Sequence, residues 1–243
     1  MIVLIVTVVR VKSMDSHRIS GRILAENIAG PGMMRLVEQS MQAQAQKTSV
    51  TEIAVKEWKH PQAALTFDDG PDIRYTPFLL DGLKERNVRA SFFLLGEKVE
   101  QYPELVERMQ KEGHLVGNHT YHHVQLNKLN ETKAREEILK TNNLIYETTG
   151  VYPLYLRPPF GAWKKNLELC VEMLPVFWTI DTLDWKVKNT EKIVRTVKEQ
   201  IEDGAIILMH DEYDTSVEAA LQVVDELKNQ GYELVTVDQL ILP

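Results

Sequence analysis

From about Trp58 onward, short apolar runs alternate with segments of helical periodicity, and this rhythm restricts the chain to few folds. Seven runs are expected to be strands, and they cover residues 63–67, 90–95, 114–118, 154–156, 176–180, 205–209 and 234–237. Between them, apolar side chains recur at helical spacing, as from Val217 to Leu227 before Gly231, where a left-handed cap is expected. A repeated order of strand, helix and strand predicts parallel strands with helical crossovers, and therefore an α/β domain.

Chemically reactive side chains follow five of the expected strands at their carboxyl ends. They are Asp68 and Asp69, His119 and His123, Arg157, Asp181 and Asp184, and His210. In a barrel the carboxyl ends of many strands converge on one face, whereas a doubly wound open sheet concentrates its site at one switch point. We therefore expect a barrel. A full eight-unit barrel takes about 250 residues, so the 186 residues from 58 to 243 predict an incomplete one with about seven strands.

The charge balance argues against nucleic acid as a partner. The chain has 28 Lys and Arg against 35 Asp and Glu, a net charge of −7, whereas binding to a phosphate backbone requires clustered positive charge. We therefore expect no nucleic-acid partner.

The single cysteine, Cys170, excludes an intrachain disulfide and a cluster of thiolate metal ligands.

The first 57 residues do not share the strand and helix rhythm, so they are expected to form a separate N-terminal arm or linker before a domain at 58–243. The longest apolar run, residues 1–9, is shorter than the ~20 residues that a helix needs to span a bilayer. It also lacks the positively charged leader of a signal peptide. Two interpretations stay open: a β-branched strand, or the remnant of a membrane anchor whose true start lies upstream. Membrane anchoring follows only from the second.

Two histidines after the third expected strand suggest a metal site. His119 and His123 are four residues apart, so on a helical turn both imidazoles would face the same way and His122 would point away. Asp69, at the end of a neighbouring strand, would complete a set of two histidines and one carboxylate that leaves positions open for water and substrate. Histidines at this spacing are also often incidental, so the pair alone does not decide for a metal.

Two further segments have both a structural and a catalytic interpretation. Asp-Asp-Gly-Pro at 68–71 is good turn chemistry after a strand, but beside a metal one acid would bind the ion while its neighbour takes a proton from water. Arg-Pro-Pro-Phe-Gly at 157–161 suits a rigid turn, and it would equally hold a backbone N–H where an oxyanion develops.

Five segments in order resemble the five motifs of the polysaccharide deacetylase family, the NodB-homology group and family 4 of the carbohydrate esterases. They are Thr-Phe-Asp-Asp-Gly-Pro at 66–71, His-Thr-Tyr-His-His at 119–123, Arg-Pro-Pro-Phe-Gly at 157–161, Asp-Thr-Leu-Asp-Trp at 181–185 and Leu-Met-His at 208–210. The resemblance extends from about residue 60 to the C-terminus. It implies that residues 58–243 are a catalytic domain with a distorted, incomplete (β/α) barrel.

Carried over motif by motif, the resemblance implies a metal centre with a general base beside it. Asp69, His119 and His123 would be the metal ligands, and Asp68 would be the general base, held and tuned by Arg157. Zn²⁺ is expected because imidazole and carboxylate ligands suit it, although Co²⁺, Mn²⁺, Ni²⁺ or Fe²⁺ use the same ligands.

The resemblance implies roles for five more residues. Phe160, where many members have Tyr, would supply a backbone N–H to the oxyanion. His210 resembles the general acid, with Asp184 orienting and charging it. Trp185 and Leu208 would form the walls of the pocket for the acetyl methyl group.

The implied reaction is the metal-dependent hydrolysis of N-acetyl groups on N-acetylglucosamine residues of a polysaccharide, which releases acetate. Such a hydrolase acts on carbon–nitrogen bonds of linear amides other than peptide bonds. An acetylated glycan is the expected partner, with peptidoglycan favoured, and an extracellular or cell-envelope location follows. The alternatives are a deacetylase of chitin or chito-oligosaccharides, an O-acetyl xylan esterase, a catalytically silent glycan-binding protein, and an interaction protein in which the first 57 residues matter most.

Overall fold

The computed structural model describes residues 60–163 and 173–241. The predictions for residues 1–57 concern a segment outside these residues, and Cys170 lies outside them as well. Within these described ranges, eight strands form one parallel sheet: β1 (Gln62–Asp68), β2 (Ser91–Leu94), β3 (Leu115–Asn118), β4 (Tyr155–Leu156), β5 (Leu174–Pro175), β6 (Ile180–Asp181), β7 (Ala205–His210) and β8 (Glu233–Leu234). Their order is β5-β4-β3-β2-β1-β7-β6, and β8 pairs with β1 off this path.

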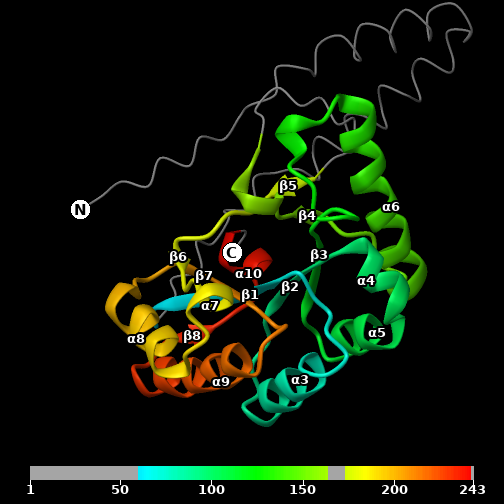
Figure 1. Ribbon diagram of the computed structural model, residues 1–243. Helices are drawn as coiled ribbons and strands as arrows, with labels where there is room; N and C mark the ends of the chain where they lie inside the picture. The colour runs from blue at the N-terminus through cyan, green and yellow to red at the C-terminus, as the bar shows by residue number, and fades with distance from the viewer. Residues whose placement is uncertain (1–59, 164–172, 242–243) are drawn as a thin grey trace, which may run out of the picture. The chain divides into compact units, whose positions relative to one another are not determined.

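The sheet curls into a barrel that stays open between β5 and β6, the two ends of the strand order (Figure 1). The expected fold, a distorted, incomplete (β/α) barrel with about seven parallel strands, is therefore confirmed. The carboxyl ends of parallel strands lie at the same edge of a sheet, so Asp68, Asn118, Asp181 and His210 all end their strands there. Asp68 and His210 are direct neighbours in the register of β1 and β7.

Five of the expected strands agree with the structure to within one residue at each end, two were wrong by more, and β5 was not expected. Residues 176–180 are not one strand, because Val176 N donates to Leu156 O at one edge of the sheet and Thr179 N donates to Ile206 O at the other. This run therefore crosses the opening of the barrel between β5 and β6. The last expected strand, 234–237, is also shorter, since β8 ends at Leu234 and Val237 begins a helix.

The helices that connect the strands lie outside the curled sheet (Figure 1). They are α3 (Thr76–Glu85), α4 (Gly96–Gln101), α5 (Pro103–Lys111), α6 (Glu131–Thr149), α7 (Asp184–Val187), α8 (Thr190–Gln200) and α9 (Asp214–Asn229), with short 3₁₀ turns at Leu126–Lys128 and Pro159–Gly161. The last helix, α10 (Val237–Ile241), follows β8 and clusters through Val237 with Ala64 and Phe93 on the opposite face of the sheet. Gly231, with φ of 83°, follows α9 in the left-handed conformation expected there. No helix in the described ranges is long and apolar enough to cross a membrane.

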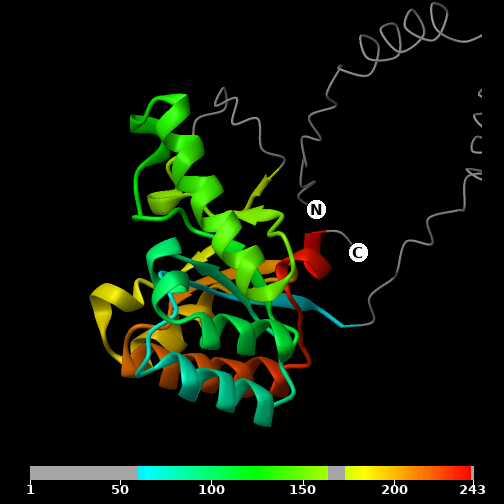
Figure 2. The same cartoon turned by 90° about the vertical axis from the view of Figure 1, so that its right-hand side faces the viewer.

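The main core lies between the sheet and these helices. All seven residues of β1 are buried, and Phe67 stacks on Phe92 of the neighbouring strand with ring centroids 5.2 Å apart. Helices α3, α5 and α9 lie side by side against the sheet (Figure 2) and contribute Leu79, Val106 and Val224 to this core. Burial of both the strands and the apolar helix faces holds the strand ends in a constant arrangement.

Candidate active site

A hollow of about 430 Å³ opens over the carboxyl ends of the strands, and we call it the strand-end hollow. Its lining residues are Asp68, Asp69, His119, His123, Phe160, Trp178, Asp181, Trp185, Leu208, His210, Glu212 and Tyr213. Of the ten residues assigned to the site from the sequence, eight line it, whereas Arg157 and Asp184 lie fully buried behind it.

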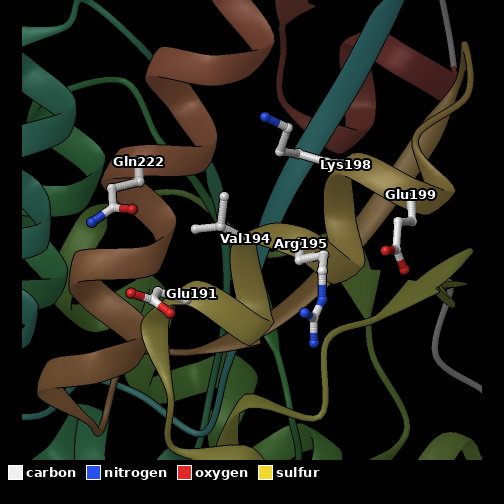
Figure 3. Close-up of a pocket in the computed structure, with 6 residues that line it drawn as sticks. All are labelled: Glu191, Val194, Arg195, Lys198, Glu199 and Gln222. Atoms are coloured by element: carbon white, nitrogen blue, oxygen red, sulfur yellow. The ribbon is translucent and has the colours of Figure 1, made fainter.

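A second hollow, of about 500 Å³, lies on α8 and α9 (Figure 3) and shares no residue with the first. It is lined by Glu191, Val194, Arg195, Lys198, Glu199 and Gln222. None of the ten residues assigned to the site from the sequence lines this second hollow. The strand-end hollow is therefore the candidate active site.

Asp69, His119 and His123 come together in this hollow. Oδ1 of Asp69 lies 3.4 Å from Nε2 of His119 and 3.4 Å from Nε2 of His123, and the ligand atoms of the three residues all lie within 4.8 Å of one another. Two imidazoles and one carboxylate, all from one side, leave coordination positions for water and substrate. This arrangement can hold one metal ion.

The expected helical turn between the two histidines was wrong. The segment after β3 is irregular, and Thr120 and His123 have positive φ values of 68° and 56°. Its N–H groups donate to side chains rather than to carbonyls four residues earlier: Thr120 N to Asn118 Oδ1, and both Tyr121 N and His122 N to Glu137 Oε2. The carbonyl oxygens of Thr120 and Tyr121 also accept from Gly96 N and Glu97 N. The histidines converge because of these contacts with other segments and not because of helical periodicity.

The chemistry of the three side chains fits a metal ion. Nδ1 of His119 lies 2.6 Å from the carbonyl oxygen of Arg157. Because that carbonyl can only accept, Nδ1 carries the proton and Nε2 is left with a free lone pair. Within the described residues, the buried Oδ1 of Asp69 has no hydrogen-bond partner, which is the state of a carboxylate oxygen that a cation would satisfy.

Electrostatics keeps Asp69 and His123 in the protonation states that a metal ion would need. Burial alone would raise the pKa of Asp69, but the surrounding His119, His123 and His210 hold the pKa of that carboxyl well below its usual range. Burial, together with the nearby His119, lowers the pKa of His123 despite the opposing charge of Asp69. An ionised Asp69 and a neutral His123 are both ready to bind a cation.

Asp68 is held on one side and free on the other. Its Oδ1 accepts a hydrogen bond of 2.9 Å from Nη1 of the fully buried Arg157, which also donates to Thr66 Oγ1 at 2.6 Å. Its Oδ2 lies 3.7 Å from Nε2 of His119 and so faces the candidate metal ligands. This orientation leaves one carboxylate oxygen able to accept a proton beside the metal site.

His210 is bound at one ring nitrogen and points the other at the hollow. Its Nδ1 lies 2.8 Å from Oδ1 of the buried Asp184, and its backbone N donates to Oδ2 of the same carboxylate at 2.7 Å. Nε2 lies 3.9 Å from Oδ2 of Asp69. Burial lowers the pKa of His210, but the hydrogen bond and charge of Asp184, with the charges of Asp68 and Asp69, raise it to about 9. A protonated His210 can donate from Nε2.

Three other residues assigned from the sequence line the hollow. Phe160 has a left-handed conformation, with φ of 59°, and its exposed ring packs 4.5 Å from the ring of His123. Trp185 is about half exposed at the rim, whereas Leu208 is buried in β7. The hollow thus has an apolar wall beside its polar floor.

Sequence reasoning missed the residues that support the site from behind or from its rim. The support comes from Thr66, Asn118 and Glu137, and the additional lining residues are Trp178, Glu212 and Tyr213. Asn118 and Glu212 stand next to or two residues from expected site residues, so position alone was a usable signal. Glu137 lies in the middle of a helix, where the sequence carries no such signal.

Comparison with known proteins finds relatives over most of this chain. The sequence model of the family described as polysaccharide deacetylase matches residues 56–176. The peptidoglycan-N-acetylglucosamine deacetylase PgdA of Listeria monocytogenes is 44% identical over 177 residues, which are 73% of this chain and 38% of that protein. A peptidoglycan-N-acetylglucosamine deacetylase of Bacillus cereus is 40% identical over 186 residues, covering 74% of this chain and 68% of the relative. The chain thus spans less than half the length of the Listeria relative.

A solved structure is similar over a comparable share of the chain. The peptidoglycan deacetylase PdaC from Bacillus subtilis matches with a TM-score of 0.73 and 42% sequence identity, over 75% of this chain and 91% of that one. The two chains therefore share their fold and are similar in sequence as well.

Proposed function

The chain belongs to the polysaccharide deacetylase family, and we propose that it is a metal-dependent hydrolase that removes N-acetyl groups from N-acetylglucosamine residues of peptidoglycan. The observation that carries this proposal is the arrangement of two proton-transfer groups around one candidate metal site. Oδ2 of Asp68 and Nε2 of His210 each lie within 4 Å of a member of the Asp69, His119 and His123 set. Amide hydrolysis needs both, one to accept a proton and one to donate it.

Asp69, His119 and His123 are the proposed metal ligands, and the bound ion, for which we propose Zn²⁺, would activate water and polarise the amide carbonyl. Asp68 accepts the proton of the attacking water through Oδ2, while Arg157 holds Oδ1. Attack on the carbonyl carbon leaves a negative charge on the carbonyl oxygen. The backbone N–H of Phe160 is the proposed donor to that oxygen.

His210 completes the reaction by protonating the nitrogen of the departing amino sugar. The carbon–nitrogen bond then breaks, and acetate and a free amine are released. The ion pair with Asp184 supports this role, because it favours the protonated imidazole. Trp185 and Leu208, both in the lining of the hollow, are the proposed walls for the acetyl methyl group.

The peptidoglycan substrate is proposed from the names of the relatives. Since those proteins are peptidoglycan deacetylases, the cell envelope or the exterior is the proposed place of action. A silent glycan-binding protein would ordinarily have lost a ligand, the base or the acid. All five of the corresponding side chains line the strand-end hollow, which favours an enzyme over a silent glycan-binding protein. They are Asp68, Asp69, His119, His123 and His210.

Acetate release tests the proposal. The full chain, loaded with Zn²⁺, is incubated with peptidoglycan and, side by side, with N-acetylated chito-oligosaccharides, each with and without a chelator. We expect acetate from peptidoglycan, its loss on chelation, and recovery with Zn²⁺ or Co²⁺. Acetate from the chito-oligosaccharides alone would replace peptidoglycan by chitin as the substrate, and no acetate from either would refute the deacetylase.

A further inference from the structure

The loop between the two proposed metal-ligating histidines is held by a carboxylate from a helix that carries no site residue. Oε2 of Glu137, in α6, accepts hydrogen bonds from Tyr121 N at 3.0 Å and from His122 N at 2.9 Å. Its other oxygen, Oε1, lies 2.7 Å from Nδ1 of His122. A single carboxylate thus binds two of the three residues that separate His119 from His123.

We propose that Glu137 is a positioning residue for the metal site, which sets the place of His123 relative to His119 through the backbone of Tyr121 and His122. This inference rests on the proposed function, since it assigns a role toward the ion of that site. Glu137 touches neither substrate nor ion in this role. Its carboxylate accepts hydrogen bonds from the backbone N–H groups of a loop that has no helical hydrogen bonds of its own.

Helix α6, which carries this carboxylate, is fixed at both of its ends and to strand β3. It is capped at its start by Asn130, whose side chain accepts from Lys133 N, and at its end by Gly150 in the left-handed conformation. The side chain of Asn118, the last residue of β3, donates to the carbonyl of Ile138 at 2.9 Å and to Asn142 Oδ1 at 2.7 Å. The helix is therefore tied to the strand that precedes His119, next to the position of Glu137.

The two histidines depend on Glu137 to different degrees. His119 is held independently, because its backbone N donates to Leu94 O at 2.9 Å and its Nδ1 binds the carbonyl of Arg157. His123 lies on the far side of the loop, has a positive φ, and keeps 30% of its side chain exposed. A loss of the Glu137 hydrogen bonds should therefore displace His123 and leave His119 in place.

The Glu137 carboxylate does more than form an ion pair with the side chain of His122, because it also binds the backbone of the loop. The side chain of His122 is 58% exposed, whereas that of Glu137 is 15% exposed. Two of the three contacts of Glu137 are to backbone N–H groups, which His122→Ala would keep. If Glu137 positions the loop, replacing Glu137 and replacing His122 must have different effects on the metal site.

Zinc binding by the full chain tests this role without reference to acetate release. The dissociation constant for Zn²⁺ is measured by competition with a chromophoric chelator, and the visible absorption of the Co²⁺-substituted protein reports the ligand geometry. Loss of a group that orients a metal ligand typically weakens affinity about 10- to 100-fold. We expect that loss, with a changed Co²⁺ spectrum, for Glu137→Ala.

Four further variants separate positioning from other effects. Glu137→Gln should retain Zn²⁺ affinity, because its amide oxygen can accept both N–H groups, and His122→Ala should retain it as well. Glu136→Ala, an exposed glutamate on the same helix, is the matched control and should bind like the wild type. Glu137→Asp shortens the side chain, so its carboxylate is drawn back from the loop and Zn²⁺ binding should be weaker. If Glu137→Ala does not fold, Glu137→Asp tests the positioning role in its place.

The proposal is overturned by wild-type Zn²⁺ affinity in folded Glu137→Ala or in Glu137→Asp. It is overturned as well if Glu137→Gln loses as much affinity as Glu137→Ala, since the charge rather than the hydrogen bonds would then matter. An equal loss in Glu136→Ala would make the effect a general one of α6. Failure of acetate release in the wild type would contradict the proposed function, while these binding results would still judge the role of Glu137.

Discussion

Asp211 should make the stability of the protein depend on pH between about 5 and 8. Its side chain is fully buried, one oxygen accepts from Thr76 Oγ1, and Oδ1 has no hydrogen-bond partner within the described residues. A Cβ on Gly70 would lie 2.4 Å from that Oδ1, so the carboxyl group is packed against the backbone of the Asp-Asp-Gly-Pro turn. Burial raises the pKa of Asp211 to about 7 from its ordinary value of 3.8, despite the bond from Thr76.

The sign follows from proton linkage. Because the folded state binds the proton more tightly than the unfolded state, the stabilisation is fully present below pH 3.8 and is lost as the pH rises through about 7. With these two pKa values, the loss between pH 5 and pH 8 is about 3 kcal/mol, at about 1.4 kcal/mol for each pKa unit. Asp211→Asn keeps the shape and stays neutral, so it should not show this loss.

The free energy of unfolding is measured by denaturant titration of the metal-free full chain at pH 5, 6, 7 and 8. The difference between Asp211→Asn and wild type should shift by about 3 kcal/mol in favour of the variant from pH 5 to pH 8. Glu136→Gln, at an exposed position, serves as the control and should follow the wild type. A difference between Asp211→Asn and wild type that is constant over this range would refute the reasoning, because it would show that Asp211 does not take up a proton on folding.

Three substitutions examine the proposed reaction. Asp68→Asn should keep bound Zn²⁺ but lose about 100- to 10,000-fold in acetate-release rate; an empty site or normal turnover would mean that the base is wrongly assigned. Asp69→Ala should lose the metal itself, since it deletes one of the three proposed protein ligands, and elemental analysis that finds full occupancy would contradict this. Asp184→Asn should bring the pKa of His210 from about 9 to its ordinary value or below, because burial then acts without the opposing carboxylate. An NMR titration of the histidine ring in the metal-free protein measures that pKa, and an unchanged value would exclude Asp184 as its cause.

The sequence by itself was sufficient for the architecture and for the side chains that gather at one end of it. Alternation of short apolar runs with helical periodicity is a local property, and it predicted parallel strands that the structure confirms. Since parallel strands end at the same edge, residues as far apart as Asp68, His119 and His210 were expected on one face. All three line the strand-end hollow.

The local hydrophobic pattern gave a wrong prediction where one apolar segment forms hydrogen bonds with two separate edges of the sheet. Residues 176–180 have the composition of a strand, but Val176 bonds to the β4 edge and Thr179 to the β7 edge. A hydrophobic run shows that a segment is buried and does not show which edge of a sheet it pairs with. Where the barrel stays open was therefore decided by the packing of the whole sheet.

The local form of the site was also decided by contacts between distant segments. The spacing of His119 and His123 suggested a helical turn, yet the loop follows the carboxylate of Glu137, 16 residues beyond Tyr121. Arg157 reaches Asp68 across 89 residues while its own carbonyl binds His119. The residue types are given by the sequence, and the ends of the strands can be predicted from it because they depend on neighbours along the chain. The direction of each side chain depends on hydrogen bonds that exist only after the helices and strands have packed, and so it was decided by the tertiary structure.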